Sequence, residues 1–492
     1  MADYRGLKAT CGDDSTPQSS NLLEAIKANA SLEAPCLIDG ATGNTVTYGQ
    51  LLHEVRETAR AFESKERKLA FLVAQNTVDS VLVYLALLQA GHTVCLWSAG
   101  TDTQAMQASV DLYAPHFIVG MTELRAKHYA SMDALGAIPV ATRSDDTKLA
   151  ISHNTAILLT TSGSTGSSKL VRLSHRNIVA NALSIKRYLK LTPTERAITM
   201  LPMSYSYGLS VLNSHLVSGA SIVLSQEPVV SREFWQTFKT RECTSLVGVP
   251  YIHQTLLKIG IYRKPPPSLR YVTQAGGRLD PGVSREIHGS LCAHGIPFFV
   301  MYGQTEATAR ISFIPPDELP TRFESIGKAI PGGELSVVDE CGKSCAPLQV
   351  GQLLYRGPNV MMGYAECPAD LARGDELDGQ LLTGDLGFYD EAGFFFLTGR
   401  MKRIAKILGM RVSLDEVEAF LAGWCPTAVV ERNETIRCFY ELSNHHHALE
   451  MRKELSERLG LQSDFLDFQA VEKLPRTPNG KLDYQKLAAL HE

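Results

Sequence analysis

Short apolar runs alternate with stretches of helical pattern over most of the chain, and this alternation constrains the fold more than any other feature of the sequence. The runs are of strand length, and helical stretches such as Ser231–Arg241 stand between several of them. Alternation of this kind is typical of α/β layers in which the sheets are largely parallel. We therefore predict an α/β fold whose strands include KLAFLVAQ, GHTVCLW, HFIVG, TAILLTT, RAITMLPM, ASIVLS, TSLVGVP, RYVTQAGG and PFFVMYG.

The pattern changes at two places further along the chain. After about Pro331 the runs GELSVVDE, GQLLYRG and GFFFLTGR are short strands with turns between them, as in a small β-rich subdomain. After Arg400, helical and strand patterns mix in a compact α+β segment. A chain of 492 residues is too long for one hydrophobic core. We predict a flexible tail over 1–20, a large N-terminal domain of layered α/β sheets over 21–400 with its β-rich subdomain at about 331–400, and a small α+β C-terminal domain over 401–492.

Composition and charge argue against several classes of protein. The net charge is −4 and 44% of the residues are hydrophobic, so neither nucleic acid nor an anionic membrane is predicted as a partner. The longest apolar stretch, SVLVYLALLQAGHTVCLW, is interrupted by Gln, Gly and His, whereas a transmembrane helix needs about 20 apolar residues. The ten cysteines include no CxxC pair, which disfavours a zinc site and favours reduced thiols. The polar N-terminus has no signal-peptide pattern, and we expect a cytoplasmic protein without a transmembrane segment.

A run rich in Gly, Ser and Thr, TSGSTGSSK, follows the apolar strand AILLT. Gly163 and Gly166 allow backbone conformations closed to other residues, so backbone N–H groups, hydroxyls and Lys169 can converge on phosphate oxygens. A flexible Ser/Gly linker is the alternative, but the apolar strand before the run and the lysine after it favour phosphate. The Walker spacing is absent, because two serines separate Gly166 from Lys169 and no Ser or Thr follows the lysine. The candidate phosphate-binding residues are Thr161, Ser162, Gly163, Ser164, Thr165, Gly166 and Lys169.

Four further motifs carry groups that suit a nucleotide. YGQTEATA supplies an aromatic face, a hydroxyl and a carboxylate, which suit a purine, a phosphate and Mg²⁺. QAGGRL ends a predicted strand with paired glycines. LLTGDLGFYDEAGFFFLTGR holds Asp385 in a turn and Arg400 after a strand, so a carboxylate can accept from hydroxyls and an arginine can bond nearby oxygens. In LPRTPNGKLDYQKL, the prolines and the Asn-Gly pair favour a turn with Lys481 at its tip.

Together and in this order, these motifs resemble those of the ANL adenylate-forming enzymes, which include acyl-CoA synthetases, peptide-synthetase adenylation domains and luciferases. The resemblance covers the chain from roughly Leu32 to its C-terminus. It implies two steps: a carboxylate attacks the α-phosphate of Mg-ATP to give an acyl-adenylate and pyrophosphate, and a thiol then displaces AMP. Since the two steps need different groups, the resemblance also implies a mobile C-terminal domain that turns about a hinge at Lys402.

The resemblance assigns roles to individual residues. It implies that Tyr302 stacks on adenine, that Thr305 contacts the α-phosphate and that Glu306 holds the metal ion. Asp385 and Arg400 match the ribose-binding pair of the group. The glycine-rich loop is expected to hold the β- and γ-phosphates. The other positions implied in cofactor binding are Gly276, Gly277, Arg278 and Gly303.

Two lysines of the small domain complete the catalytic set that the resemblance implies. Lys481 matches a lysine that binds the substrate carboxylate and the α-phosphate, where an ammonium suits the charge that develops as the carboxylate attacks phosphorus. Lys406 matches a basic position that some members use in the second half-reaction, and an exposed lysine without a role is the alternative. The predicted catalytic residues are Lys481, Glu306, Thr305 and Lys406.

The stretch PMSYSYG is similar to the segment that opens the acyl pocket of acyl-CoA synthetases, with Tyr205 in place of their usual histidine. Relatives that activate amino acids usually have an Asp here to pair the α-ammonium. The residues from Ser204 to Tyr207 include no acid, and α-amino acids are disfavoured because a buried ammonium without a counter-charge is costly. The candidate pocket is largely apolar with some polar contacts and consists of Tyr205, Tyr207, Gly208, Leu209, Gly248, Val249, Gln274, Gly276 and Gln304.

The resemblance thus implies an AMP-forming acid–thiol ligase that uses ATP and Mg²⁺ to activate a small-molecule carboxylic acid. The acceptor thiol belongs either to coenzyme A or to the phosphopantetheine arm of an acyl or peptidyl carrier protein. Three alternatives stay open from the sequence: an amino-acid adenylation enzyme that loads a carrier protein, a non-catalytic nucleotide-binding relative, and a luciferase-like oxygenase.

Overall fold

A computed structural model describes residues 21–101, 103–121, 128–135, 138–145, 148–160, 169–408, 410–441, 448–476 and 482–489. These residues form two compact units. The larger unit contains the described residues up to Glu334 and the segment Arg356–Leu381. The smaller unit contains Leu335–Tyr355 and the described residues from Leu382 onward. The units divide the chain at other positions than 400/401, so the predicted boundary and hinge there stay predictions.

The first sheet of the larger unit has a parallel centre. It is built from β1 (Pro35–Asp39), β2 (Thr45–Thr47), β10 (Arg196–Ile198), β11 (Ser221–Leu224), β12 (Ser245–Gly248), β13 (Tyr271–Gln274), β14 (Phe298–Tyr302), β15 (Ser312–Phe313) and β16 (Ser325–Ala329). Within this unit the strand order is β16-β15-β14-β13-β12-β10-β11-β1-β2. Neighbours are parallel from β14 to β1, and β2, β15 and β16 add antiparallel edges. Strands β11, β12 and β13 are buried along their whole length, as expected for parallel strands covered on both faces.

The second sheet of the larger unit carries the strand that precedes the glycine-rich run. It is built from β3 (Leu69–Ala74), β4 (Thr93–Ser98), β5 (Phe117–Val119), β6 (Tyr129–Leu135), β7 (Ile138–Arg143), β8 (Thr155–Thr160), β9 (Leu170–Ser174) and β19 (Gly363–Ala365). The order is β19-β9-β8-β4-β3-β5-β7-β6, with parallel pairs between β8, β4, β3 and β5. The antiparallel pairing of β19 with β9 joins segments that lie far apart in the sequence.

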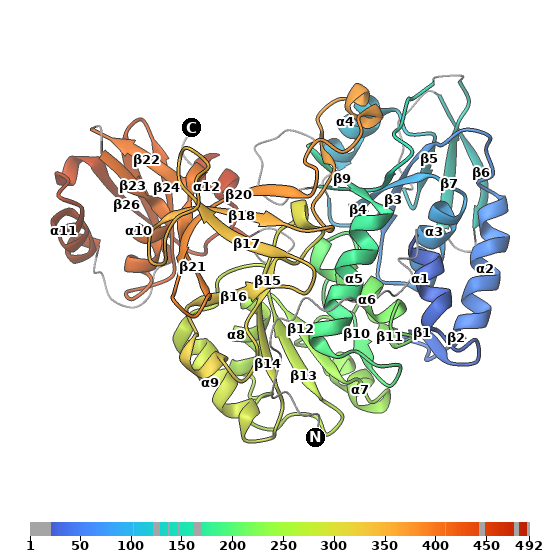
Figure 1. Ribbon diagram of the computed structural model, residues 1–492, viewed down its shortest axis with the longest axis horizontal. Helices are drawn as coiled ribbons and strands as arrows, with labels where there is room; N and C mark the ends of the chain where they lie inside the picture. The colour runs from blue at the N-terminus through green and yellow to red at the C-terminus, as the bar shows by residue number, and fades with distance from the viewer. Residues whose placement is uncertain are drawn as a thin grey trace. The chain divides into compact units, whose positions relative to one another are not determined.

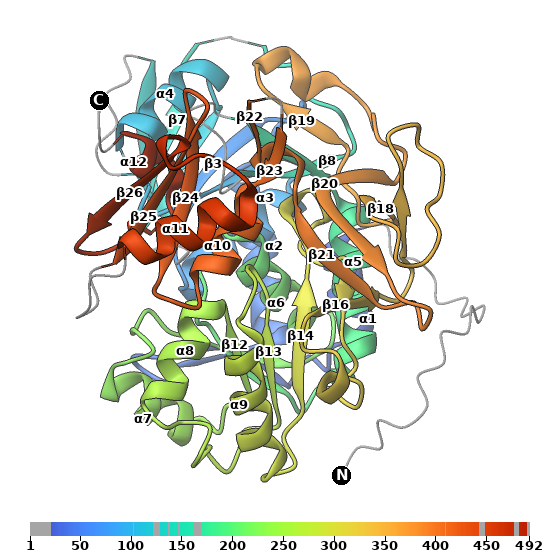
Figure 2. The ribbon, with the colours of Figure 1, turned by 90° about the vertical axis from the view of Figure 1, so that its left-hand side faces the viewer.

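Helices cover the sheets in layers (Figure 1). The helices of the larger unit are α1 (Leu22–Asn29), α2 (Tyr48–Arg60), α3 (Val78–Gln89), α4 (Thr103–Tyr113), α5 (His175–Leu189), α6 (Ser206–Leu216), α7 (Arg232–Thr240), α8 (Pro250–Lys258) and α9 (Pro281–Cys292), with short 3₁₀ turns η1 (Thr305–Ala307), η2 (Leu319–Thr321) and η3 (Pro368–Ala372). Helix α5 packs on β8 and β9, α6 packs on β10 and β11, and the two helices pack on each other, so they form the layer between the sheets. Figure 2 shows α7, α8 and α9 gathered beside β12–β14. Within the described ranges, no helix has the length and apolar character needed to cross a membrane.

This architecture confirms the predicted α/β fold. Each of the nine apolar runs predicted as strands, from KLAFLVAQ to PFFVMYG, contains or overlaps a strand of one of the two sheets. The predicted helix at Ser231–Arg241 is α7, which Ser231 caps by accepting from the Phe234 backbone N–H.

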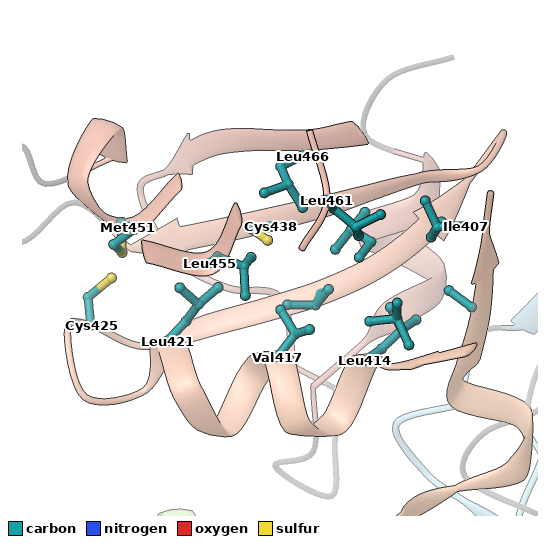
Figure 3. Close-up of a cluster of buried hydrophobic side chains, with 14 residues drawn as sticks. Ile407, Leu414, Val417, Leu421, Cys425, Cys438, Met451, Leu455, Leu461 and Leu466 are labelled. Atoms are coloured by element: carbon teal, nitrogen blue, oxygen red, sulfur yellow. The ribbon is translucent and has the colours of Figure 1, made fainter. Parts of the chain in front are cut away.

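The described residues of the smaller unit form nine strands and three helices. Its strands are β17 (Glu334–Val338), β18 (Gly351–Arg356), β20 (Gln380–Tyr389), β21 (Phe395–Arg400), β22 (Ile404–Ile407), β23 (Met410–Ser413), β24 (Thr427–Arg432), β25 (Thr435–Glu441) and β26 (Leu466–Val471). Its helices are α10 (Leu414–Leu421), α11 (Ala448–Leu459) and α12 (Tyr484–Ala489), with 3₁₀ turns η4 (Met401–Arg403) and η5 (Ser463–Phe465). Val417 and Leu421 of α10 point toward Leu455 of α11 and Cys438 of β25 in a buried cluster (Figure 3).

A buried ionic network ties α12 to the rest of the smaller unit. Glu418 of α10 accepts from Arg403 Nη2 at 2.6 Å, from the backbone N–H of Val429 at 2.7 Å and from the Tyr484 hydroxyl at 2.9 Å. The Arg403 guanidinium carbon also lies 4.1 Å from the centre of the Tyr484 ring. Glu418 therefore fixes three elements at once, including the first residue of α12.

Replacing Glu418 by alanine is expected to destabilise the smaller unit by about 3 kcal/mol, because Arg403 and the Val429 N–H lose a largely buried partner. Hydrogen exchange of the β24–β25 amides should therefore become about 100-fold faster. Glu416→Ala is the matched control, since Glu416 is an exposed residue of the same helix. Equal exchange rates in the two variants would show that the network does not stabilise the unit.

Candidate active site

Lys169 lies where the predicted phosphate loop ends. Strand β8 ends at Thr160 and pairs with β9, which begins at Leu170. The Lys169 ammonium lies 3.0 Å from Glu366 Oε1 and 3.7 Å from the centre of the Tyr364 ring, a favourable position for a cation. Both partners belong to β19 or follow it directly, so the β19–β9 pairing creates the contact. The other predicted loop residues, which lie outside the described part of the chain, are Thr161, Ser162, Gly163, Ser164, Thr165 and Gly166.

Tyr364 connects Lys169 to Glu306. Its hydroxyl donates to Glu306 Oε1 at 2.8 Å, while its ring faces the Lys169 ammonium. Burial raises the pKa of Tyr364, and the Glu306 carboxylate raises this pKa further, so the hydroxyl keeps its proton. The structure thus brings together a lysine and a carboxylate from two predicted motifs through a tyrosine that the sequence did not single out. Nothing in the local sequence MMGYAE marks this tyrosine, because its contacts depend on the pairing of β19 with β9.

A tight turn after β14 presents Glu306. The turn η1 spans Thr305–Ala307, and Thr308 follows with a left-handed φ of 58°. The buried Asn359 holds this turn. Its side-chain Nδ2 donates at 2.8 Å to the carbonyls of Ala307 and Arg310, and its backbone carbonyl accepts from the Thr308 hydroxyl at 2.6 Å. The carbonyl of Glu306 accepts from the Met361 N–H at 2.8 Å. Asn359 is therefore a positioning residue that sequence reasoning missed.

Gly303 is the first residue after β14, at a position where only glycine fits. A Cβ at this position would lie 1.9 Å from the carbonyl oxygen of Ala309, so no side chain fits there. On either side of it, Tyr302 and Gln304 are partly exposed, with Gln304 Nε2 3.5 Å from the Tyr302 hydroxyl. The predicted adenine-stacking ring and a predicted pocket residue thus flank the start of the turn that carries Glu306.

The first turn of α6 joins the candidate acyl pocket to this site. Ser206 Oγ lies 3.2 Å from Thr305 Oγ1. The Tyr207 hydroxyl donates to the Thr273 carbonyl at 3.1 Å, which fixes the ring against β13. The same turn contains two more predicted pocket residues, both buried, Gly208 and Leu209.

The ends of β12 and β13 form another side of the candidate pocket. Gly248 and Gln274 are register partners, and the Gln274 amide donates to the Gly277 carbonyl at 2.8 Å. Gly276 has a left-handed φ of 83°, and a Cβ there would lie 2.6 Å from the Tyr205 hydroxyl oxygen. Residues predicted from three separate motifs therefore meet at one place. The exposed residues that follow along the chain are Gly277 and Arg278.

The smaller unit holds the predicted ribose pair. Asp385 of β20 lies opposite Arg400 of β21, and Arg400 Nε donates to Asp385 Oδ1 at 2.9 Å. Asp385 is buried, whereas Arg400 is exposed. The backbone of Lys402 lies in η4 and that of Lys406 in β22, but their side chains, and the whole of Lys481, lie outside the described residues.

The two layered sheets have the fold of adenylate-forming enzymes. The structure of an o-succinylbenzoate CoA synthetase from Bacillus subtilis, solved with an acyl-adenylate intermediate, superposes with a TM-score of 0.76 at 23% identity and covers 95% of this chain and 98% of its own. The ATP-bound structure of MatB from Rhodopseudomonas palustris also gives a TM-score of 0.76, at 21% identity, over 95% of this chain and 98% of its own. At these identities the likeness establishes the fold.

The chain belongs to the AMP-binding enzyme family, whose model matches residues 25–365. An oxalate–CoA ligase from Arabidopsis thaliana is 29% identical over 71% of this chain and 72% of its own length. A sulfoacetate–CoA ligase from Cupriavidus necator is 30% identical over 68% of this chain and 66% of its own length. The predicted membership of the ANL superfamily is confirmed, and with it the predicted enzyme class, an AMP-forming acid–thiol ligase.

Proposed function

We propose that the protein uses ATP to activate a carboxylic acid as an acyl-adenylate and then transfers the acyl group to the thiol of coenzyme A. The observation that carries the proposal is the linkage of Lys169 to Glu306 through Tyr364. It places an ammonium and a carboxylate, which suit phosphate oxygens and Mg²⁺, in one contact network. The CoA ligases among its relatives support coenzyme A as acceptor. A carrier protein with a phosphopantetheine arm presents the same thiol and is the alternative acceptor.

The donor set around Glu306 fits Mg²⁺ that arrives with ATP. Among the described residues, no group of three or more His, Cys, Asp or Glu side chains could hold a metal ion by itself. Mg²⁺ needs only one or two carboxylates when substrate phosphates and waters supply its other ligands, so Glu306 suffices. A B. subtilis o-succinylbenzoate CoA synthetase was solved with ATP and a magnesium ion, which supports this pairing. The bound ion would neutralise phosphate charge.

In the first step, an oxygen of the substrate carboxylate forms a bond to the α-phosphorus and the bond to pyrophosphate breaks. The Thr305 hydroxyl, 3.2 Å from Ser206 Oγ at the mouth of the candidate acyl pocket, is placed to donate to an α-phosphate oxygen. Lys169 and the glycine-rich loop hold the leaving β- and γ-phosphates. These residues contribute by positioning and by charge, and none of them forms a covalent intermediate.

In the second step, the thiol sulfur forms a bond to the acyl carbon and the bond from that carbon to AMP breaks, with the thiol proton passing to solvent. We assign Tyr302 to stacking on adenine and Asp385 to accepting from the ribose hydroxyls. The hydrogen bond from Arg400 orients the Asp385 carboxylate for this purpose. We assign Lys406 to this step and Lys481 to the first.

The acid binds between the first turn of α6 and the ends of β12 and β13. Tyr205, Tyr207 and Gln274 line this region, and the absence of an acidic residue from Ser204 to Tyr207 disfavours an α-ammonium. The relatives are named for acids as different as oxalate, sulfoacetate and medium-chain fatty acids, so membership of the family leaves the acid undefined.

Acid-dependent exchange of labelled pyrophosphate into ATP is the test of this function. We expect exchange that requires Mg²⁺ and a carboxylic acid from a panel of fatty, aryl, dicarboxylic and amino acids. Thioester formation is then compared between coenzyme A and a holo-carrier protein, with coenzyme A expected to be the better acceptor. ATP binding without exchange for any acid would instead identify a non-catalytic relative, and exchange confined to α-amino acids would favour a carrier-loading enzyme.

A further inference from the structure

Arg310 is a buried cation whose charge is not paired within the described residues. It follows the turn that carries Glu306 and is 2% exposed. Its Nη1 donates to the Ala309 carbonyl at 3.4 Å, and its Nε has no hydrogen-bond partner. No carboxylate of the described residues forms an ion pair with its guanidinium. Arginines are almost never fully buried unless they are paired, because an unpaired buried charge costs several kcal/mol.

Three tyrosines, two of them from the candidate acyl pocket, lie near this guanidinium. The Arg310 Cζ lies 4.0 Å from the centre of the Tyr207 ring. Burial raises the pKa of Tyr188, Tyr205 and Tyr207, and the charge of Arg310 opposes the rise in each case. A desolvated cation–π contact contributes about 2 kcal/mol, which offsets part of the cost of burial. The Tyr188 hydroxyl is near enough to hydrogen-bond the guanidinium, but it is a neutral acceptor and does not balance the charge.

A small, mostly apolar cavity lies beside Arg310. Its volume is about 10 Å³, which is room for one water molecule and none for a carboxylate. Besides Arg310, the polar residues that line it are Ser210, Ser214, His215, Tyr271 and Thr273. The Tyr207 ring that faces the guanidinium lies 6.4 Å, centre to centre, from the Tyr205 ring, whose hydroxyl lies against Gly276 of the candidate acyl pocket.

Helix α6 gives the distance between Arg310 and the reacting end of the pocket. Ser206 lies 3.2 Å from Thr305, where the substrate carboxylate meets the α-phosphate in the proposed function. Tyr207, the next residue, faces the Arg310 guanidinium, and Ser210, one turn deeper in α6, lines the same cavity as Arg310. Four residues of α-helix rise about 6 Å, so a second group on the acid meets the guanidinium about 5–6 Å from the reacting carboxylate.

We propose that Arg310 is the counter-ion for a second anionic group on the acid, and that the substrate class is short dicarboxylic acids with about three to four carbons between the carboxylates. This inference rests on the proposed function and adds its substrate class. The planar guanidinium presents paired N–H donors that match a carboxylate, and the bound substrate supplies the charge that the protein lacks at this position.

The test compares acids matched in length, with and without the second carboxylate. Pyrophosphate exchange is measured with glutarate against valerate and with adipate against hexanoate. We expect kcat/KM to be at least 100-fold higher for each dicarboxylate, because a buried charge left unpaired discriminates strongly against the analogue that lacks its partner. Arg310→Met should lower kcat/KM for the dicarboxylates at least 100-fold and raise it for the monocarboxylates, whereas Arg310→Lys should keep part of the original preference.

Arg285→Met is the matched control, since Arg285 is an exposed arginine of α9 that lies 5.2 Å from the Phe323 ring. Thermal melting of each variant checks that it is folded. The assignment of Arg310 is overturned if dicarboxylates and monocarboxylates support exchange equally well, or if Arg310→Met keeps the preference for dicarboxylates. Either result leaves the proposed function intact. Exchange with no acid of any class overturns both.

Discussion

Replacing Glu306 by glutamine is expected to lower the rate of acid-dependent pyrophosphate exchange by about 100- to 1000-fold, because the substitution removes the one carboxylate that we assign to Mg²⁺. The glutamine side chain has nearly the same shape and can still accept from the Tyr364 hydroxyl, so the turn held by Asn359 should be kept. The variant should also need a higher Mg²⁺ concentration for half-maximal rate. Exchange at the wild-type rate and Mg²⁺ requirement would contradict the assignment of the metal to Glu306.

Tyr364→Phe tests whether Glu306 must be held in position, because the variant keeps the Glu306 carboxylate and removes one of its hydrogen bonds. The variant loses the 2.8 Å hydrogen bond to Glu306 Oε1 but keeps the ring beside Lys169. Loss of one hydrogen bond to a charged group costs about 1.5 kcal/mol, so we expect a decrease of about tenfold together with a raised Mg²⁺ requirement. A decrease without any change in Mg²⁺ requirement would mean that Tyr364 acts on Lys169 or on the fold.

The fold was predictable because its signal is local. A parallel strand that is buried on both faces must be apolar along its whole length, and runs such as TSLVGVP and RYVTQAGG meet that condition without reference to the rest of the chain. The caps of helices are local as well, as the Ser231 cap of α7 illustrates. Gly303 was predicted through the family resemblance, and the structure gives its physical reason, a close approach of the backbone that only glycine tolerates.

The parts of the site that escaped prediction depend on contacts between distant segments. Tyr364 reaches Lys169 only because β19 pairs with β9, and Asn359 reaches the turn after β14 from a segment more than fifty residues away. Arg310 directly follows the motif YGQTEATA, but the sequence does not show its role. The role is inferred from its burial against Tyr207 and from the lack of an ion-pair partner among the described residues. A single sequence contains the residue types but not these neighbours.

Replacing Lys481 is expected to slow the first half-reaction and to leave the second almost unchanged. Its neighbours in the chain fix the base of the segment that carries it: Arg476 and Leu482 form an antiparallel bridge, and the Asp483 N–H donates to the Pro475 carbonyl at 2.9 Å. The Tyr484 hydroxyl then anchors this base to the buried Glu418. An ammonium placed at the α-phosphate stabilises the charge that develops there as the carboxylate attacks.

Lys481→Ala should therefore lower pyrophosphate exchange by at least 100-fold, while thioester formation from supplied acyl-adenylate and coenzyme A should stay within about twofold of wild type. Lys473→Ala, at an exposed lysine of the same segment, is the matched control and should leave both rates unchanged. Near-normal exchange in Lys481→Ala would remove this lysine from adenylation. An equal loss in both half-reactions would instead indicate that it supports the fold of the smaller unit, because the second half-reaction transfers no phosphoryl group and has no need of an ammonium at the attacked phosphorus.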